Sequence, residues 1–358
     1  MKLGKLSGIL QTYRPKKVVI TVEQNDKARR VEGILVKAIV HHKYGSPDVL
    51  EFQEIDKPVA ADDEVLVRVH AASLNILDWY GISGLAIGRI GGGLRRPKDP
   101  RVGVDFAGVV AGVGANVKLF KPGDEVYGGR GGSFAEYVTI REQRGIAPKP
   151  ASVTFEQAAT VPVAGLTALQ GLRDKGQIQP GQKVLINGAS GGVGIFAVQI
   201  AKAFGAEVTA VCHTRHVDAI RSLGADHVVD YAREDFTQSR QRYDLMLDVA
   251  GGRSWRECRR VLKPNATFVI IGGPKTNRLI GPLAHVIRIR VAALRASQKI
   301  IFFITNINRG DLMFMNELME AGKVTPLIDH QYPLSELPAA MRHFAEGHPH
   351  GKIVITVV

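Results

Sequence analysis

The sequence predicts an α/β protein with two domains, a β-rich one and one built on a doubly wound parallel sheet. Three observations lead to this prediction. The 358 residues are 45% hydrophobic and 23% charged, which is typical of a globular chain long enough for two cores. Residues 37 to about 150 contain short alternating runs separated by Gly, Pro and Asp turns. From residue 183 onward, strand and helix patterns alternate.

The β-rich part opens with a predicted hairpin. Residues 36–55 place two apolar runs on either side of a Gly-Ser-Pro-Asp turn. Further strands are expected at Glu64 to Val69 and at Phe106 to Val113. Residues 82–100 read as a long Gly- and Arg-rich loop, and long loops of this kind are often functional.

The second part predicts strands separated by helices. Strands are expected at 183–187, 207–212, 226–230, 243–248 and 267–271, with helices at 193–204, 217–223 and 255–262. This rhythm is that of a parallel sheet covered by helices on both faces. After residue 305, two helical stretches (311–321 and 336–344) precede a last strand at 352–357.

The positive charge is concentrated at the start of the chain. The formal net charge is +13, and residues 1–36, with eight Lys or Arg and three acids, contribute +5 of it. We interpret residues 1–36 as a basic N-terminal extension. It is either an upstream addition to a chain that originally began at Val36 or an arm with its own partner. The remaining charge fits a solvated basic surface, an anionic ligand or a nucleic-acid partner.

Cysteine usage and hydropathy indicate a compartment. The chain has only Cys212 and Cys258, which excludes a disulfide framework and leaves little basis for a cysteine-built zinc site. No apolar run approaches the 18 or so residues of a spanning helix. We therefore expect a cytoplasmic protein without a membrane partner.

The strongest motif runs from Val184 to Gly194, a buried strand that leads through four glycines into a helix. In such a loop Gly191 lets the backbone approach a pyrophosphate and Gly194 lets helix and strand pack closely. The first glycine of the usual G-x-G-x-x-G pattern is Ala189 here, displaced by Gly188. Inside a complete strand, helix, strand unit, the loop predicts dinucleotide binding. The residues expected to bind are Gly188, Ala189, Ser190, Gly191, Gly192, Val193 and Gly194.

The end of the next strand indicates which dinucleotide binds. An acid there would hold the 2′-hydroxyl of NAD, but the chain reads Cys212-His-Thr-Arg-His216 and has no carboxylate before Asp218. Arg215 can pair with a 2′-phosphate, and Thr214 and His216 can add hydrogen bonds, so NADP(H) is the predicted cofactor. The alternative is that Arg215 is only a surface residue at the start of a helix.

The order of these features resembles the medium-chain dehydrogenase/reductase superfamily, and within it the zinc-free quinone oxidoreductase branch. The resemblance covers about residues 37–358. It implies a GroES-like catalytic domain formed by 37–164 and 305–358, and a Rossmann NADP(H)-binding domain at 165–304. It also implies a homodimer formed through an edge strand of the Rossmann sheet. Besides the glycine loop, its marks are Tyr44-Gly-Ser-Pro-Asp-Val-Leu50, Ser73-Leu-Asn-Ile-Leu-Asp-Trp-Tyr80, Gly103-Val-Asp-Phe-Ala-Gly108, Phe120-Lys-Pro-Gly-Asp-Glu-Val126, Gly165-Leu-Thr-Ala168, Leu223-Gly-Ala-Asp226 and Gly351-Lys-Ile-Val354.

The zinc ligands of that superfamily are missing. Its zinc alcohol dehydrogenases bind a catalytic metal through a cysteine near the Asn75 position and a His-Glu pair, which here reads Val104-Asp105. Because ligands suited to zinc are absent, no metal site is predicted. The chemistry is then expected to rest on the cofactor, whose hydride can add to an electron-poor carbon of a quinone or an enone.

The catalytic residues are assigned by resemblance to the family segment N-x-x-D-x-Y, which is implied to lie beside nicotinamide and substrate. It implies that Asn75 hydrogen-bonds cofactor or substrate, that Tyr80 donates to the developing enolate or quinol oxygen, and that Asp78 orients its neighbours. The plainer alternative is that Asp78 caps the following turn and Tyr80 packs in the core.

The same resemblance implies further cofactor contacts. Thr167 is expected near the nicotinamide ribose and Tyr231 near the 2′-phosphate. The backbone of Gly272 and Gly273 is expected to clamp the nicotinamide. Tyr231 could equally be an ordinary aromatic residue at the end of a strand.

Together these features predict NADPH-dependent, metal-free reduction of quinones or α,β-unsaturated carbonyls by hydride transfer. Two alternatives stay open. One is a carbonyl or alcohol oxidoreductase of the same fold. The other is an NADPH-binding protein that acts mainly as a basic nucleic-acid binder, although the sequence lacks the interleaved aromatic and basic residues typical of stacking platforms.

Overall fold

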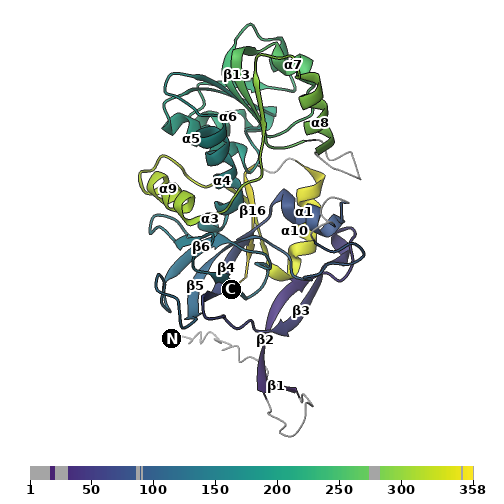
Figure 1. Ribbon diagram of the computed structural model, residues 1–358, viewed down its shortest axis with the longest axis vertical. Helices are drawn as coiled ribbons and strands as arrows, with labels where there is room; N and C mark the ends of the chain where they lie inside the picture. The colour runs from purple at the N-terminus through teal and green to yellow at the C-terminus, as the bar shows by residue number, and fades with distance from the viewer. Residues whose placement is uncertain are drawn as a thin grey trace, which may run out of the picture.

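Figure 1 shows the computed structural model, which describes residues 17–20, 31–85, 89, 92–273, 283–347 and 350–357. Parts of the predicted N-terminal extension and of the loop at 82–100 lie outside the described residues. Two sheets form the centres of the molecule, one in its lower and one in its upper part in Figure 1.

The lower sheet confirms the predicted β-rich part. Its order is β15-β16-β4-β5-β6-β8, and β7 pairs with β4. The C-terminal strand β16 lies beside β4, so the end of the chain returns to this sheet. The strands are β4 (Glu64–Ser73), β5 (Asp105–Val113), β6 (Glu125–Gly129), β7 (Tyr137–Arg141), β8 (Ile146–Pro148), β15 (Ile328–Pro333) and β16 (Lys352–Thr356).

The predicted hairpin is also present. β2 (Val31–Val40) and β3 (Glu51–Asp56) are antiparallel, and the short helix η1 (Pro47–Val49) lies in their connection. β1 (Lys17–Ile20) pairs with the first residues of β2. Strand pairing therefore begins before Val36, inside the stretch we interpreted as an extension.

The upper sheet is parallel throughout and has the order β11-β10-β9-β12-β13-β14. The chain crosses from one side of β9 to the other, as in a doubly wound sheet, and this confirms the predicted fold class. The strands are β9 (Lys183–Asn187), β10 (Glu207–Cys212), β11 (His227–Asp230), β12 (Tyr243–Asp248), β13 (Leu262–Ile270) and β14 (Lys299–Phe302).

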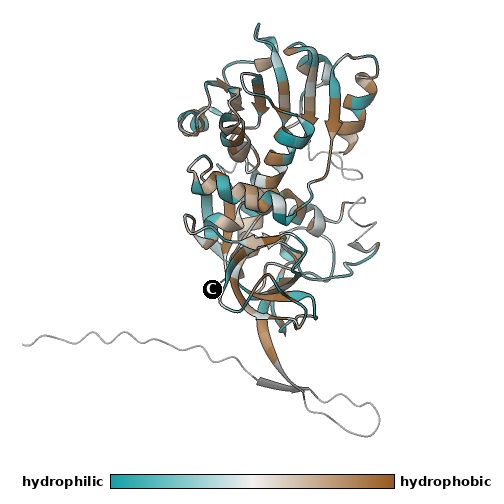
Figure 2. Ribbon diagram, turned by 60° about the vertical axis from the view of Figure 1, so that its left-hand side comes forward, coloured by the Kyte–Doolittle hydropathy of each residue, from teal (hydrophilic) through white to brown (hydrophobic). Residues whose placement is uncertain are grey.

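Helices cover both faces of the upper sheet, and each face has its own core. Val184 and Ile186 of β9 pack with α4 and α5, while Leu185 packs with α7 and α8 on the opposite face. Figure 2 shows the apolar interior of these strands. The helices are α4 (Pro162–Gln170), α5 (Gly194–Ala203), α6 (Val217–Ser222), α7 (Trp255–Arg259) and α8 (Leu283–Ala292). Helix α7 is shorter than predicted because the chain enters β13 at Leu262.

Of the remaining helices, α3 (Phe155–Ala159) and α9 (Arg309–Glu320) lie in the two connections between the sheets, and α1 (Ile76–Ser83) and α10 (Leu337–Glu346) link strands of the lower sheet. α1 follows β4, α3 precedes α4, and α9 and α10 lie in the returning tail. The last two match the helical stretches expected at 311–321 and 336–344. Among the described residues, no helix combines the length and apolar character needed to cross a membrane.

Candidate active site

The predicted catalytic motif lies where β4 ends and α1 begins. Asn75 is the N-cap residue of α1 and has extended backbone angles. The carboxylate of Asp78 accepts a hydrogen bond from the Asn75 amide N–H (2.8 Å), which satisfies a donor at the helix start. Asp78 therefore caps the helix, as the plainer interpretation expected. The same bond fixes the backbone from which the Asn75 side chain projects.

The Asn75 side chain belongs to a buried polar network centred on Asp105, the first residue of β5. Asn75 Nδ2 donates to Asp105 Oδ2 (2.8 Å), and Ser73 Oγ donates to the same oxygen (3.0 Å). The other oxygen, Oδ1, accepts from the backbone N–H of Val163 (3.0 Å). Three chain segments thus meet at one carboxylate that is fully buried.

Lys352, the first residue of β16, supplies the cation of this network. Its Nζ donates to the Leu74 carbonyl (2.8 Å) and to Asn75 Oδ1, and it lies 3.8 Å from Asp105 Oδ2. The Lys352 side chain is only 3% exposed. We call Ser73, Asn75, Asp78, Asp105 and Lys352 the Asn75 network. The cost of burying this lysine is offset because an acid and two oxygen acceptors surround its ammonium group.

Burial dominates the protonation of this network. Burial, together with the nearby charge of Asp105, raises the pKa of Asp78 to about 7, although the hydrogen bond from the Asn75 amide and the charge of Lys352 oppose the rise. Burial also raises the pKa of Asp105 and lowers the pKa of Lys352, in each case against the partner's charge. Asp78 therefore exchanges its proton near neutral pH, unlike an ordinary surface carboxylate.

We expect Asp78→Asn to make the protein's stability less dependent on pH. Because the folded-state pKa lies above the ordinary 3.8, the folded state favours the protonated carboxyl. Wild type should therefore lose stability relative to Asp78→Asn as the pH rises from 4 toward 7, by about 1.4 kcal/mol per pH unit. Urea unfolding of both proteins and of the surface control Asp62→Asn measures this. Parallel stability profiles for wild type and Asp78→Asn from pH 4 to 8 would contradict it.

The network does not fit a catalytic zinc ion. The resemblance matches the metal-binding positions of the zinc dehydrogenases to Asn75 and Val104-Asp105, where valine offers no ligand and the oxygens of Asn75 and Asp105 face Lys352 Nζ. A zinc ion would have to displace that cation, and an amide and one carboxylate are a weak donor set for it. Among the described residues, one group could hold a metal ion, on β15 and α10, where the ligand atoms of Asp329, His330 and His343 lie within 4.8 Å of one another. It shares no residue with the network.

The glycines of the loop have two different roles. Some allow close packing within the loop, and one leaves the backbone open to a ligand. A Cβ on Gly194 would lie 2.2 Å from the Gly188 carbonyl oxygen, so the close turn requires glycine there. Gly188 has φ of +90° and packs against Ala250. By contrast, a Cβ on Gly191 would meet only the Gly188 oxygen, at 3.5 Å. That open backbone, at the start of α5, is where a pyrophosphate can approach.

The loop and the Asn75 network are in direct contact. A Cβ on Gly192 would lie 2.9 Å from Lys352 Cδ, and the amide of Gly351 donates to the carbonyl of Ser190 (3.0 Å). The returning tail therefore joins the cofactor loop to the catalytic segment.

The predicted 2′-phosphate residues lie together at the ends of β10 and β11, but their hydrogen bonds differ from our expectation. Thr214 Oγ1 donates to Asp230 Oδ2 (2.6 Å). Arg215 Nε donates to Nε2 of His216 (3.0 Å). His216 is buried, and burial and neighbouring His350 lower its pKa to about 4. His216 is therefore a neutral acceptor that orients Arg215, rather than a ligand aimed outward. Tyr231 is exposed and its ring contacts His213 edge-on.

Sequence reasoning missed two charged residues at this site. Asp230 is an acid beside the expected phosphate, and the hydroxyl of Thr214 is the main cause of its lowered pKa. Arg233 Nε lies 3.4 Å from Asp230 Oδ2 and balances that charge. The sequence did contain a sign of this ion pair, because Arg233 lies three residues after Asp230, the acid that ends the strand.

The other predicted cofactor residues are also placed. Thr167 on α4 donates to the Val163 carbonyl (2.6 Å), and its hydroxyl contacts that of Thr305, which we had not predicted. Gly272 follows β13, where a Cβ would lie 2.0 Å from the Val249 carbonyl oxygen. A Cβ on Gly251 would in turn meet Gly273 at 2.6 Å. The Gly272–Gly273 turn is thus packed against the end of β12, at the carboxyl edge of the sheet. Tyr80 is half-buried on α1, and burial raises its pKa.

Comparison with known proteins decides the family. Residues 61–151 match the family model described as alcohol dehydrogenase GroES-like domain, and residues 223–355 match the one described as zinc-binding dehydrogenase. The chain is 35% identical over 376 residues to the mitochondrial NAD(P)H oxidoreductase RTN4IP1 of Homo sapiens, with 94% of each chain covered. It belongs to the medium-chain dehydrogenase/reductase superfamily. This confirms the predicted family and a nicotinamide-dependent oxidoreductase.

Two further relatives of this medium-chain dehydrogenase/reductase protein are named quinone oxidoreductases. It is 32% identical over 344 residues to the chloroplastic quinone-oxidoreductase QR1 of Triphysaria versicolor, covering 90% of this chain and 99% of that one. The solved quinone oxidoreductase of Coxiella burnetii superposes with a TM-score of 0.80 at 30% identity, covering 90% of this chain and all of the other.

Proposed function

We propose that the protein reduces quinones or α,β-unsaturated carbonyls by hydride transfer from NADPH, without a metal. The Asn75 network carries this proposal, because the oxygens of Asn75 and Asp105 face the buried Lys352 side chain and do not form a set of metal ligands. Without a Lewis acid, the site suits a substrate carbon that is already electron-poor. NADPH, when bound, supplies the hydride.

The chain's own residues would orient the reactants and donate a hydrogen bond to the oxygen that gains charge. The side chain of Asn75 is held by Asp105 and Lys352, so its orientation is fixed before substrate arrives. Tyr80 has a raised pKa and keeps its proton at neutral pH, which suits a neutral donor to a developing oxyanion. Asp78 would orient both through the first turn of α1.

The same proposal prefers NADP(H) over NAD(H). We expect Arg215→Asp to lower the ratio of kcat/KM for NADPH to that for NADH by about 100-fold, because a charge-assisted bond to the 2′-phosphate is lost and repulsion replaces it. Steady-state kinetics with both cofactors measures the ratio. Arg221→Asp, on exposed α6, is the matched control. An unchanged ratio in Arg215→Asp would remove the 2′-phosphate assignment.

The function is tested by NADPH oxidation over a panel of quinones, alkenals and enones at fixed salt, with and without a chelator. Activity on these acceptors that resists the chelator is the expected result, and Tyr80→Phe should slow enone reduction. Activity only on simple aldehydes or alcohols would favour the alternative carbonyl or alcohol oxidoreductase. Steeply salt-dependent nucleic-acid binding without NADPH oxidation would favour the nucleic-acid binder.

The oligomeric state and the cellular location are proposals as well. We propose a homodimer through β14, which is the edge strand of the upper sheet in the described chain. Analytical ultracentrifugation tests it. We also propose a cytoplasmic location on the basis of the two buried free cysteines. Cell fractionation tests that.

A further inference from the structure

Helix α8 carries apolar side chains on two sides. Its inner side buries Val286 and Ile289 in the core shared with α7. Its outer side carries three large apolar residues that stay in water. Their exposed fractions are 54% for Ile287, 62% for Val291 and, just past the helix end, 81% for Leu294. The spacing i, i+4, i+7 puts them in one stripe, where a surface helix normally carries polar residues.

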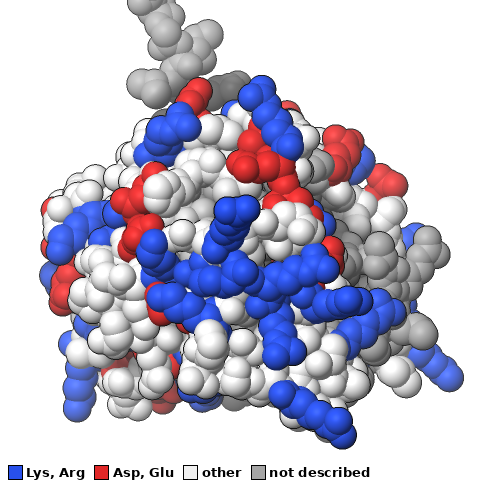
Figure 3. Space-filling view, turned by 90° about the horizontal axis from the view of Figure 1, so that it is seen from above, with Lys and Arg blue, Asp and Glu red and all other residues white. Residues whose placement is uncertain are grey.

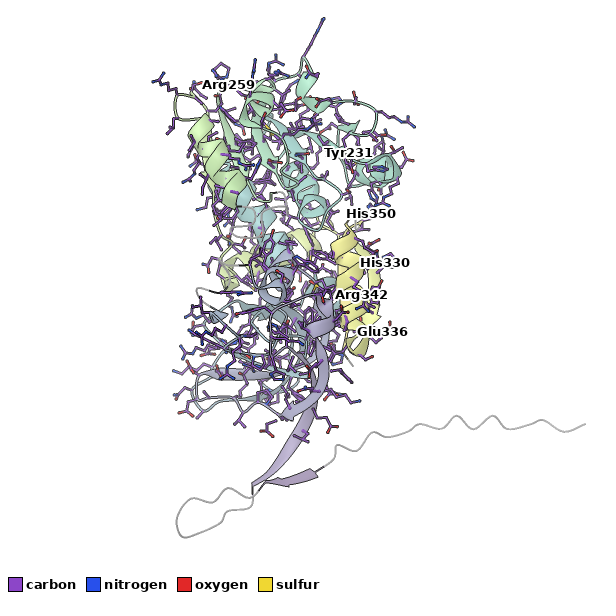
Figure 4. All side chains as sticks on the ribbon, turned by 90° about the vertical axis from the view of Figure 1, so that its right-hand side faces the viewer. Tyr231, Arg259, His330, Glu336, Arg342 and His350 are labelled. Carbon is purple, nitrogen blue, oxygen red and sulfur yellow. The ribbon has the colours of Figure 1, made fainter. Side chains whose placement is uncertain are left out.

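Six exposed arginines lie on α7, on α8 and within three residues after each helix. None of the six has an ion-pair partner among the residues that the structure describes. Figure 3 shows Lys and Arg gathered on this end of the molecule, and Figure 4 places Arg259 at the end far from the lower sheet. We call the stripe and these arginines the α7–α8 face. The six are Arg256, Arg259, Arg260, Arg288, Arg290 and Arg295.

The face is also hollowed. A shallow depression of about 450 Å³ lies between the two helices and is lined by Trp255, Arg256, Arg259, Arg260 and Ala292. Three guanidinium groups at one hollow offer planar, paired donors of the kind that phosphate oxygens accept.

We propose that the α7–α8 face binds the surface of a bilayer that contains anionic phospholipids. Arginines would contact lipid phosphates, and the stripe of Ile287, Val291 and Leu294 would enter the boundary between headgroups and acyl chains. We had expected no membrane partner because the sequence lacks a spanning segment, but peripheral binding needs none. The proposal uses no residue of the active site and does not rest on the proposed function.

Two other occupants fit this face less well. A nucleic acid would pair with the arginines but has no use for three exposed aliphatic side chains, and the exposed part of the face has no aromatic stacking platform. A second copy of the chain, bound across a two-fold axis, would set the same arginines against one another.

The test is flotation of the purified full chain with vesicles of phosphatidylcholine alone or with 30% phosphatidylglycerol, at 0.1 M and 0.5 M NaCl, without NADPH or quinone. We expect binding to the anionic vesicles only, weakened by salt. The triple variant Arg256→Gln, Arg259→Gln, Arg260→Gln should bind on the order of 100-fold more weakly, at about fivefold for each charge lost near the surface. Replacing Ile287, Val291 and Leu294 with Ser should remove the binding that remains at high salt.

The matched control is Arg68→Gln, Arg141→Gln, Arg144→Gln, which removes the same charge from exposed positions in the lower part of the molecule. It should bind vesicles like wild type. Equal loss in this control would show that net charge, not the face, is responsible, and would overturn the proposal. So would absence of binding to anionic vesicles, full binding by the Ser variant at both salts, or tighter binding to a DNA duplex than to the vesicles.

Discussion

Lys352→Met is expected to reduce NADPH-dependent turnover by about 100-fold or more and to destabilise the protein by about 3–5 kcal/mol. Methionine keeps the side-chain length but removes the charge. The Asp105 carboxylate would then stay buried without its cation, and Asn75 Oδ1 would lose its donor. Because Lys352 also contacts Gly192, the change reaches the cofactor loop. Urea unfolding and steady-state kinetics measure both effects.

A second substitution separates this effect from simple loss of packing. The double variant Lys352→Met, Asp105→Asn removes both charges, so it should be more stable than Lys352→Met alone although it carries more changes. Turnover should recover less than stability, because Asn75 still lacks its ammonium donor. The single variant Asp105→Asn completes the comparison. If the losses of unfolding free energy in the two single variants add up to the loss in the double variant, the two charges are not coupled, and this would contradict a stabilising role for the network.

Gly191→Ala is expected to weaken NADPH binding about tenfold or more while leaving the free energy of unfolding unchanged. The new methyl group would meet only the Gly188 oxygen, at 3.5 Å, so the fold tolerates it. It would, however, occupy the backbone surface that a pyrophosphate must approach. Fluorescence titration with NADPH and urea unfolding test the two halves of this prediction.

Gly194→Ala is the comparison, because it adds the same methyl group three residues later. There the Cβ would lie 2.2 Å from the Gly188 oxygen, so the loop must shift. We expect a loss of stability of about 1–3 kcal/mol, together with weaker NADPH binding. Equal behaviour of the two variants, or tight NADPH binding by Gly191→Ala, would contradict the division of roles within the loop.

Local sequence patterns predicted the fold well where an apolar run ends at a clear turn. β9, β10 and β12 begin and end at the predicted residues, because their short apolar runs end next to glycine or polar residues such as Gly188, His213 and Asp248. Helix α8 was not predicted. Its apolar residues lie on both the buried and the exposed side, so the helical period is hidden in the sequence.

The candidate site was predictable only in part. Asn75, Asp78 and the glycines lie in compact motifs, and their place in the fold followed from them. Lys352 did not, because it is 277 residues from Asn75 and meets it only when β16 returns beside β4. The sequence predicted His216 as a phosphate ligand. In the structure its side chain is buried and accepts a hydrogen bond from Arg215. Spacing along the chain carries no information about such long-range partners.

The central claim, metal-free hydride addition to a conjugated carbon, is tested most directly by label transfer. The chelator-treated enzyme is given an α,β-unsaturated ketone and NADPH carrying deuterium in turn at each C4 position, and the product is examined by NMR. Conjugate reduction should place deuterium on the β-carbon of the saturated ketone from one of the two labelled cofactors. Deuterium on the carbonyl carbon of an allylic alcohol, or turnover that requires added metal, would contradict it.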